Sequence, residues 1–195
     1  LIDNSKDFII KDGRHSVVEK TIFKKSLNAF VPNDCSLSTN EHLWLITGPN
    51  MAGKSTFLRQ NAHIIILAQI GSYVPAKQAK IGIASKLFSR IGASDNISKG
   101  QSTFMVEMLE TSNIIKNADD KSFIILDEIG RGTSTFDGLA IAWAIIEKVL
   151  RSNKSRTLFA THYHELTEIE KTNSKVRNVS CEIKEWNDEI IYSYK

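Results

Sequence analysis

The sequence predicts an α/β fold in which helices flank a central, mainly parallel sheet. Three short apolar runs, 43–46, 123–126 and 158–160, lack the alternation of a half-exposed strand and suit strands that are buried on both faces. Helical patterns lie between and after these runs, and such alternation produces right-handed βαβ crossovers. With 195 residues, 42% of them hydrophobic, the chain is large enough for one domain around a packed core.

Three helices are expected to cover this sheet. The segments 55–70 and 138–150 are apolar almost all round, which indicates helices that pack against a sheet. The segment 102–116 is amphipathic, with Phe104, Met105, Met108, Leu109 and Ile115 at helical spacing. Together with the three strands, these helices predict a core over residues 41–170.

The two ends of the chain are expected to add peripheral β elements to this core. Residues 1–40 are expected to be rich in loops, with one strand over 8–11. Residues 171–195 become strand-like from Val176, and Asn187-Asp188 provides a turn before a last apolar run, which predicts a β-hairpin. The whole chain, 1–195, is therefore expected to be one domain.

Composition excludes several classes of protein. The 25 basic and 22 acidic residues give a net charge of +3. The sequence has no dense Lys/Arg cluster, so strong binding of nucleic acid by this chain alone is not expected. Cys35 and Cys181 are too few for a disulfide scaffold and have no metal-binding spacing. The longest uncharged run, 60–76, is too short and too polar for a membrane span. The chain begins at Leu1 without a leader, so a cytoplasmic fragment is expected.

One motif predicts a phosphate-binding loop between the first strand and the first long helix. The eight residues Gly48-Pro49-Asn50-Met51-Ala52-Gly53-Lys54-Ser55 match G-x-x-x-x-G-K-[ST] in full. Glycine lets the loop curl so that its N–H groups face phosphate oxygens, and the helix N-terminus adds a positive dipole. Lys54 is expected to reach the β- and γ-phosphates, and the Ser55 hydroxyl to bind Mg²⁺. A chance match in a strand-to-helix turn is the alternative.

A second motif supplies acidic groups at the end of the second predicted strand. Asp127 and Glu128 follow the apolar run 123–126 directly. Beside a phosphate loop, Asp127 is expected to bind Mg²⁺, and Glu128 to orient and deprotonate an attacking water. The alternative for Glu128 is a capping or salt-bridge role, because acidic residues commonly end strands.

The sequence resembles the ATPase domain of the MutS family of DNA mismatch repair proteins, from about Gly13 to its last residue. Four blocks carry the resemblance: ITGPNMAGKST at 46–56, GQSTFMVEM at 100–108, DEIGRGTSTFDG at 127–138 and TLFATHY at 157–163. The resemblance implies a P-loop fold of the ABC-ATPase type. It also implies ATP hydrolysis that drives conformational switching of a repair protein, with Mg²⁺ as cofactor.

The resemblance extends the set of expected site residues. The residues expected to bind ATP or ADP are Phe30, Val31, Gly48, Pro49, Asn50, Met51, Ala52, Gly53, Lys54, Ser55 and Thr56. Ser102 is expected to act in trans on the partner's nucleotide, and Arg131 to lie along the dimer interface. His162 is expected to join Lys54 and Glu128 in catalysis by sensing the γ-phosphate.

Simpler roles remain open for several of these residues. Phe30 could be an ordinary core aromatic, Ser102 the cap of its own helix, and Arg131 part of a loop salt bridge. His162 could be a structural histidine, and its pairing with His164 is a weak pattern for zinc.

The resemblance also implies partners. The family forms dimers through its ATPase domains, and a homodimer is expected here. Mismatched double-stranded DNA is bound in the family by domains that precede this one, so the fragment is expected to lack mismatch recognition. Downstream repair factors and the bacterial cytoplasm are the expected setting. The family also continues beyond Lys195 with a segment that helps dimerisation.

Three other functions remain open at this point. Another ABC-type ATPase, such as a transporter subunit or an SMC-like repair protein, would share the phosphate loop and the acidic pair. A relative that acts in recombination would share most of the motifs. From a different class, the chain could be a nucleotide-binding dimerisation module without catalysis, although Lys54, Ser55, Asp127 and Glu128 are all present.

Overall fold

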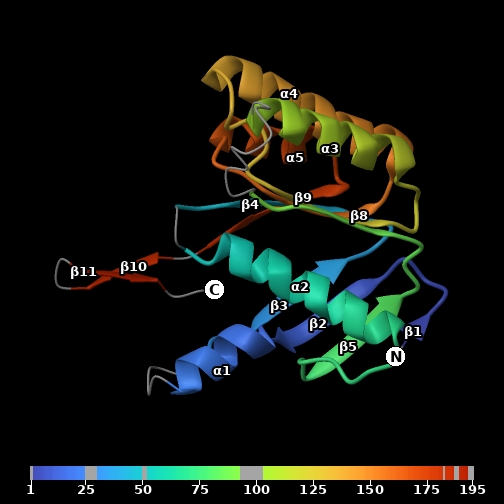
Figure 1. Ribbon diagram of the computed structural model, residues 1–195, viewed down its shortest axis with the longest axis vertical. Helices are drawn as coiled ribbons and strands as arrows, with labels where there is room; N and C mark the ends of the chain where they lie inside the picture. Colours follow the sequence, from blue (N-terminus) through green and yellow to red (C-terminus); the bar gives the residue numbers. More distant parts are fainter. Residues whose placement is uncertain are drawn as a thin grey trace.

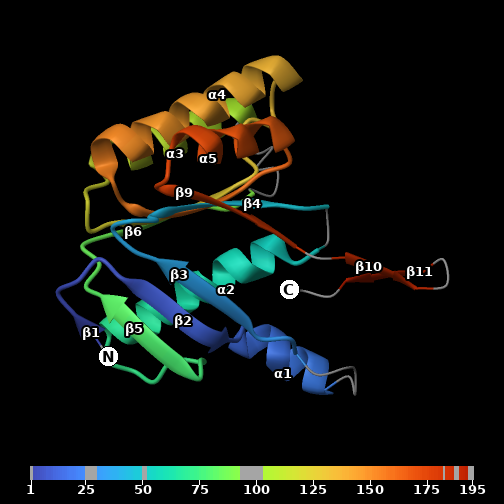
Figure 2. The same ribbon diagram turned by 180° about the vertical axis from the view of Figure 1, so that it is seen from behind.

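The computed structural model is layered, with a parallel sheet between two layers of helix and a second sheet beyond one of them (Figure 1). It describes residues 2–24, 30–49, 52–92, 103–181, 183–186 and 189–192. Helices α3, α4 and α5 cover one face of the parallel sheet. Helix α2 covers the other face and lies on the second sheet, as the reverse view confirms (Figure 2).

The central sheet has five strands in the order β6-β7-β8-β4-β9, and every pairing in it is parallel. The strands are β6 (Leu87–Arg90), β7 (Phe123–Asp127), β8 (Arg156–Ala160), β4 (Leu43–Thr47) and β9 (Val176–Ser180). The three predicted buried strands correspond to β4, β7 and β8, so the predicted fold class is confirmed. Strands β4 and β7 lie on either side of β8.

The predicted helices are present with small shifts of their ends. They are α2 (Lys54–Gln69), α3 (Thr103–Asn117) and α4 (Thr135–Lys148), which continues as a π-helical turn over Val149–Asn153. A 3₁₀ turn (His164–Glu168) and the short α5 (Ile169–Thr172) follow β8. Helix α4 begins before the predicted residue because the Ser134 hydroxyl caps it, accepting a bond from the Asp137 N–H at 3.3 Å.

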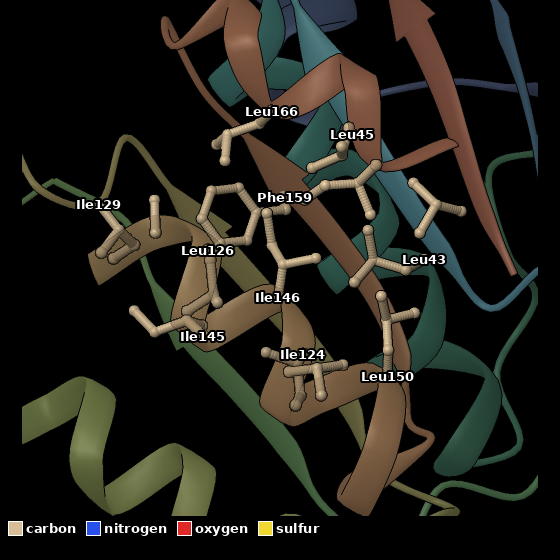
Figure 3. Packing of buried hydrophobic residues seen from close by; sticks show 14 of the residues in the cluster. Leu43, Leu45, Ile124, Leu126, Ile129, Ile145, Ile146, Leu150, Phe159 and Leu166 are labelled. Atoms are coloured by element: carbon tan, nitrogen blue, oxygen red, sulfur yellow. The ribbon is translucent and has the colours of Figure 1, made fainter. Parts of the chain in front are cut away.

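The sheet separates two hydrophobic clusters because successive side chains on a strand point to opposite faces. On β4, Leu43 and Leu45 belong to the cluster on the α4 side, whereas Trp44 and Ile46 belong to the cluster on the α2 side. Figure 3 shows the first cluster, in which Ile146 of α4 lies among strand residues and Leu166. Both faces of β4 are therefore apolar, which explains why its sequence shows no alternation.

Helix α3 differs from its prediction in the face that it buries. Its buried residues are Glu107, Thr111 and Ile114, whereas Met105 and Leu109 are each 53% exposed. The helical spacing was correct, but hydrophobicity alone assigned two apolar side chains to the wrong face. Burial of Glu107 is offset by its partners, the Gly130 N–H and Arg90.

The expectation of a loop-rich N-terminal region was wrong, although the one strand expected there, over 8–11, is present within β2. Residues 2–24 and 30–37 contain β1 (Ile2–Asp3), β2 (Phe8–Gly13), α1 (Ser16–Lys24) and β3 (Asn33–Leu37). With β5 (Gln78–Gly82), these strands form a sheet in the order β1-β5-β2-β3. Strand β3 escaped prediction because only Cys35 and Leu37 alternate with polar neighbours, and helix α1 because it buries no side chain fully.

The predicted C-terminal hairpin is present as β10 (Ile183–Trp186) paired antiparallel with β11 (Glu189–Tyr192). Its turn residues, Asn187 and Asp188, lie outside the described residues. Strand β9, expected to lead into this hairpin, instead pairs in parallel with β4 and completes the central sheet. No helix in the described ranges is both long and apolar enough to cross a lipid bilayer.

Candidate functional site

The candidate site lies at the carboxyl edge of the parallel sheet, where β4, β8 and β7 end side by side. Ala160 on β8 is level with Ile46 on β4 and with Asp127 on β7. The segments that follow these three strands therefore begin next to one another, although they are far apart in the sequence. Ligands of open α/β folds bind at this edge.

The predicted phosphate loop follows β4 and leads into α2. Gly48 has φ 128° and Gly53 has φ 92°, values that disfavour any side chain. Gly53 immediately precedes the first helical residue, Lys54, so the loop turns sharply into the N-terminus of α2. Asn50 and Met51 lie outside the described residues. The curled backbone and the helix N-terminus are the features that suit a phosphate group.

Lys54 is held against its own loop. Its Nζ donates to the carbonyl oxygens of Gly48 at 2.6 Å and of Pro49 at 2.8 Å, and the residue is only 5% exposed. A buried ammonium needs such acceptors to offset its loss of water. The same ammonium can exchange these carbonyls for phosphate oxygens without leaving the loop.

Ser55 joins the phosphate loop to the end of β7. Its hydroxyl donates to Asp127 Oδ2 at 2.6 Å, so the residues expected to hold a metal ion are in direct contact. Asp127 is buried, and its Oδ1 has no hydrogen-bond partner in the described part of the chain. A hydroxyl and a carboxylate with an uncommitted oxygen are the hard oxygen donors that suit Mg²⁺.

Glu128 occupies an unusual backbone conformation directly after β7. Its φ of 54° lies in the left-handed region, which costs a residue with a side chain on the order of 1–3 kcal/mol. The Glu128 N–H donates to the Ala160 carbonyl at 2.9 Å, and its Oε2 pairs with Arg131 at 2.6 Å. Strain of this kind is typical of functional sites, and here the surrounding bonds maintain it.

His162 lies close enough to these groups to interact with them electrostatically. Partial burial lowers the pKa of His162, and the positive charges of Arg131 and Lys54 lower it further, while Glu128 opposes them. The imidazole is therefore neutral at neutral pH, so one ring nitrogen carries a hydrogen that it can donate. The ring packs on Tyr163, with centroids 4.0 Å apart.

A clamp on the Gly130 peptide was missed by sequence reasoning. Glu107 of α3 accepts from the Gly130 N–H at 2.6 Å, and the Tyr163 hydroxyl donates to the Gly130 carbonyl at 3.0 Å. Arg90 lies 3.6 Å from the other Glu107 oxygen, so the buried acid is also ion-paired. The clamp ties the segment after Glu128 to the helix α3 and to the residue after His162. The sign of this clamp in the sequence was an acidic residue, Glu107, at a position on the face of α3 that the fold buries.

The clamp also depends on Gly138, which admits no side chain. A Cβ at this position would overlap the Tyr163 hydroxyl and the Gly130 carbonyl. The first turn of α4 therefore packs directly on the clamped peptide.

The remaining expected site residues are buried or half-buried, or lie outside the described residues. Phe30 and Val31 are half-buried just before β3, and the Val31 carbonyl accepts from the Asn33 side chain at 3.0 Å. Ala52 is buried in the phosphate loop, and Thr56 is half-buried in the first turn of α2. Ser102 lies outside the described residues.

The described ranges contain no group of three His, Cys, Asp or Glu residues that could hold a metal ion. Magnesium in nucleotide sites needs only one or two protein ligands, because phosphates and water complete its shell. Ser55 and Asp127, which are in contact, offer two oxygen ligands of this kind.

Comparison with protein families gives one match that covers this whole site. The family described as MutS domain V matches residues 44–195, which include all of β4 but its first residue, the phosphate loop, the acidic pair and His162. The match leaves out most of the N-terminal sheet.

Individual relatives are similar over the full chain. The DNA mismatch repair protein MutS of Ruegeria sp. (strain TM1040) is 55% identical over 100% of the chain, and that of Thermodesulfovibrio yellowstonii is 57% identical over 98%. The protein of the same name from Ehrlichia chaffeensis is 55% identical over 100%. The chain spans only 22%, 23% and 24% of the lengths of these three relatives, respectively.

Proposed function

The chain belongs to the MutS family, as its domain V, the ATPase domain, and from this premise we propose that it binds ATP with Mg²⁺ and hydrolyses it. The observation that supports the proposal most directly is the 2.6 Å contact between Ser55 and Asp127 beside the curled phosphate loop. Two segments 72 residues apart meet there with the donors that a nucleotide-bound magnesium ion requires.

Each group at the carboxyl edge has a distinct part in this reaction. Backbone N–H groups of the loop and of the α2 N-terminus bind the phosphates, and Lys54 exchanges its two carbonyl acceptors for phosphate oxygens. Ser55 and Asp127 hold Mg²⁺, which neutralises charge on the phosphates when it is bound.

Hydrolysis requires a base for the attacking water. Glu128 accepts a proton as the water oxygen bonds to the γ-phosphorus and the bond from that phosphorus to the bridging oxygen breaks. Arg131 holds one oxygen of the Glu128 carboxylate, and the backbone hydrogen bond to Ala160 fixes the position of the Glu128 main chain. Neutral His162 donates to a γ-phosphate oxygen and so senses whether that group is present.

We also propose that the active unit is a homodimer with composite sites. In this arrangement Ser102 reaches the γ-phosphate of the partner's nucleotide, and Phe30 and Val31 flank the adenine in their own subunit. Exposed apolar side chains on the elements next to the site support a protein contact here: Met105 and Leu109 on α3, and Phe136, which is 84% exposed at the start of α4.

The role of the whole protein rests on its relatives. Because the chain spans less than a quarter of their length, recognition of mismatched double-stranded DNA is proposed for the longer protein and assigned to regions outside this chain. In that protein, ATP binding and hydrolysis switch the conformation that grips DNA and recruits downstream repair factors. From the bacterial sources of the relatives, we propose that it acts in the bacterial cytoplasm.

The proposal is tested by measuring steady-state ATP hydrolysis over a series of protein concentrations, with and without Mg²⁺. A rate per chain that rises with concentration, and that disappears without Mg²⁺, is expected from a composite dimeric site. A constant, measurable rate per chain would overturn the composite site while leaving hydrolysis intact. Nucleotide binding without hydrolysis at every concentration would indicate a binding module instead.

A further inference from the structure

We propose that a basic hollow at the amino edge of the parallel sheet binds a phosphate-class oxyanion. The hollow has a volume of about 240 Å³, and its charged and polar lining includes Lys6, His42, Lys154, Arg156 and Lys175. It lies at the opposite edge of the sheet from the phosphate loop, so the inference does not depend on the proposed ATPase function.

Strand order explains why these residues gather. His42 directly precedes β4, Lys175 directly precedes β9, and Arg156 is the first residue of β8. Because β8, β4 and β9 are parallel neighbours, their amino ends meet at one edge. The sequence spreads the cationic residues over positions 6–175, which is why no basic cluster was visible in it.

The walls of the hollow are fixed by backbone bonds. The His42 N–H donates to the Lys175 carbonyl at 3.1 Å, and the Thr157 N–H donates to the His42 carbonyl at 2.7 Å. Lys154 has φ 51°, and its N–H donates to the Val149 carbonyl at 2.8 Å. A ligand would therefore meet preformed walls, with only the ends of the lysine side chains to adjust.

The charge in the hollow is strongly unbalanced. Three lysines and one arginine line it, and none of its described lining residues is acidic. Lys6 is ion-paired with Asp120, whereas neither Lys154 nor Lys175 is ion-paired with a carboxylate in the described ranges. Like charges held together repel, so a bound anion would relieve the repulsion as well as gain attraction.

Arg156 adds a charge that is itself almost completely buried. The residue is 1% exposed, and its guanidinium donates to the carbonyls of Lys121 at 2.7 Å and Gly82 at 2.9 Å. Its Nε has no hydrogen-bond partner in the described part of the chain. These carbonyls orient the guanidinium but carry no net charge, and the one acid that acts on it electrostatically, Asp7, is itself ion-paired with Lys80.

The pKa of His42 is affected by the positive charges around the hollow. It is 6% exposed, and its Nδ1 lies 3.2 Å from the Ser155 carbonyl. Burial lowers the pKa of His42 most, and the charges of Lys175, Lys6 and Lys154 lower it further, against the Ser155 bond, which raises it. The three lysines therefore face one buried ring from three different segments.

The lining favours a small, multiply charged oxyanion. Ser38 and Thr39 add hydroxyl groups to the ammonium groups, and this mixture of donors suits the oxygens of phosphate. The volume is below the ~300–1,000 Å³ of drug-sized pockets and amounts to roughly eight water molecules at ~30 Å³ each. Phosphate or pyrophosphate fits such a space, and so does one phosphate of a DNA strand lying across its mouth.

The test is a titration of inorganic pyrophosphate into the chain saturated with ADP, which by the proposed function occupies the phosphate loop and leaves the hollow as the free anion site. Binding is followed by calorimetry at constant ionic strength. The double variant Lys154→Asn/Lys175→Gln removes the two unpaired ammonium groups, and asparagine tolerates the left-handed backbone at position 154. We expect its affinity for pyrophosphate to fall at least tenfold.

A matched control neutralises two exposed lysines of α1, Lys20→Gln/Lys24→Gln, because α1 contributes no described residue to the hollow, and it should bind pyrophosphate like the unaltered chain. Equal affinity in both double variants, or no saturable binding to the ADP-loaded unaltered chain, would overturn the proposal. A short DNA duplex that competes with pyrophosphate would identify the source as a nucleic acid phosphate, and absence of competition would identify a free anion. The melting temperature of each variant shows that it is folded.

Discussion

The two edges of the parallel sheet differ in the groups that surround their positive charges. At the carboxyl edge, the Lys54 ammonium is bonded to two carbonyls of its own loop, and the carboxylates of Asp127 and Glu128 stand close by. At the amino edge, Lys154 and Lys175 surround a hollow without a described acidic lining residue. The same five strands therefore support one site built on directed bonds and another built on net charge.

This difference has physical consequences. Directed bonds in a buried loop depend on geometry and are poorly screened by salt, whereas exposed ammonium groups attract anions mainly through charge that salt screens within about 10 Å at 0.1 M. A substitution at the carboxyl edge should therefore have its effect by removing one particular bonding atom. A substitution at the amino edge should have its effect by changing the total charge around the hollow.

The largest effect is expected from Glu128→Gln at the carboxyl edge. The amide keeps the size of the side chain but cannot accept a proton, so turnover should fall at least ~100-fold while nucleotide binding stays close to normal. Single-turnover hydrolysis and fluorescent nucleotide titration measure the two properties separately. Glu168→Gln, an exposed acid paired with Lys171, is the control and should leave turnover unchanged. Normal hydrolysis by Glu128→Gln would disprove the base assignment.

The second effect concerns the clamp on Gly130. Glu107→Ala removes the acceptor of the Gly130 N–H and leaves Arg90 to its exposed partner Glu110, so the free energy of unfolding should fall by about 2 kcal/mol. Glu107→Gln keeps an oxygen for the Gly130 N–H but loses the charge facing Arg90, so about half that loss is expected. Urea unfolding measures both. Equal losses in the two variants would show that the ion pair, and not the clamp, carries the stability.

Sequence reasoning predicted the carboxyl edge far better than the amino edge. The phosphate loop and the acidic pair are contiguous motifs, and β4, β7 and β8 are continuous apolar runs because both of their faces are buried. The proximity of Ser55 and Asp127 then followed from the expectation that both bind Mg²⁺. Local patterns were sufficient because the chemistry is concentrated in short segments.

The missed features depend on strand order, which periodicity does not encode. The hollow exists only because β4 lies between β8 and β9, and the clamp only because α3 carries Glu107 to Gly130. The N-terminal sheet was missed because its strands pair across long gaps, with β5 lying between β1 and β2. No single stretch of sequence records such arrangements.

A smaller effect should appear at the amino edge in the absence of anions. Lys175→Gln removes one of the repelling charges, so the free energy of unfolding at low salt should stay equal or rise by a few tenths of a kcal/mol. In high salt or with pyrophosphate, the gain should vanish, because screening or binding already relieves the repulsion. Urea unfolding at two salt concentrations measures this. A large loss of stability at low salt would show that Lys175 is held by bonds, as Lys54 is, and would remove the contrast between the edges.

A pH dependence of stability also connects the two edges. The pKa values of His15, His42 and His162 are all lowered, chiefly by burial, so between their folded values and 6.5 the unfolded chain binds more protons. The free energy of unfolding should therefore be highest above pH 6.5 and fall as the pH drops below it, by at most about 1.4 kcal/mol per pH unit for each histidine.

His42→Asn, whose amide nitrogen can replace Nδ1 toward the Ser155 carbonyl, should reduce this slope without abolishing it. Pyrophosphate should reduce the slope in the unaltered chain but not in His42→Asn, because an anion in the hollow offsets the lysine charges and raises the pKa of His42. An identical slope with and without pyrophosphate would mean that the anion does not bind beside His42.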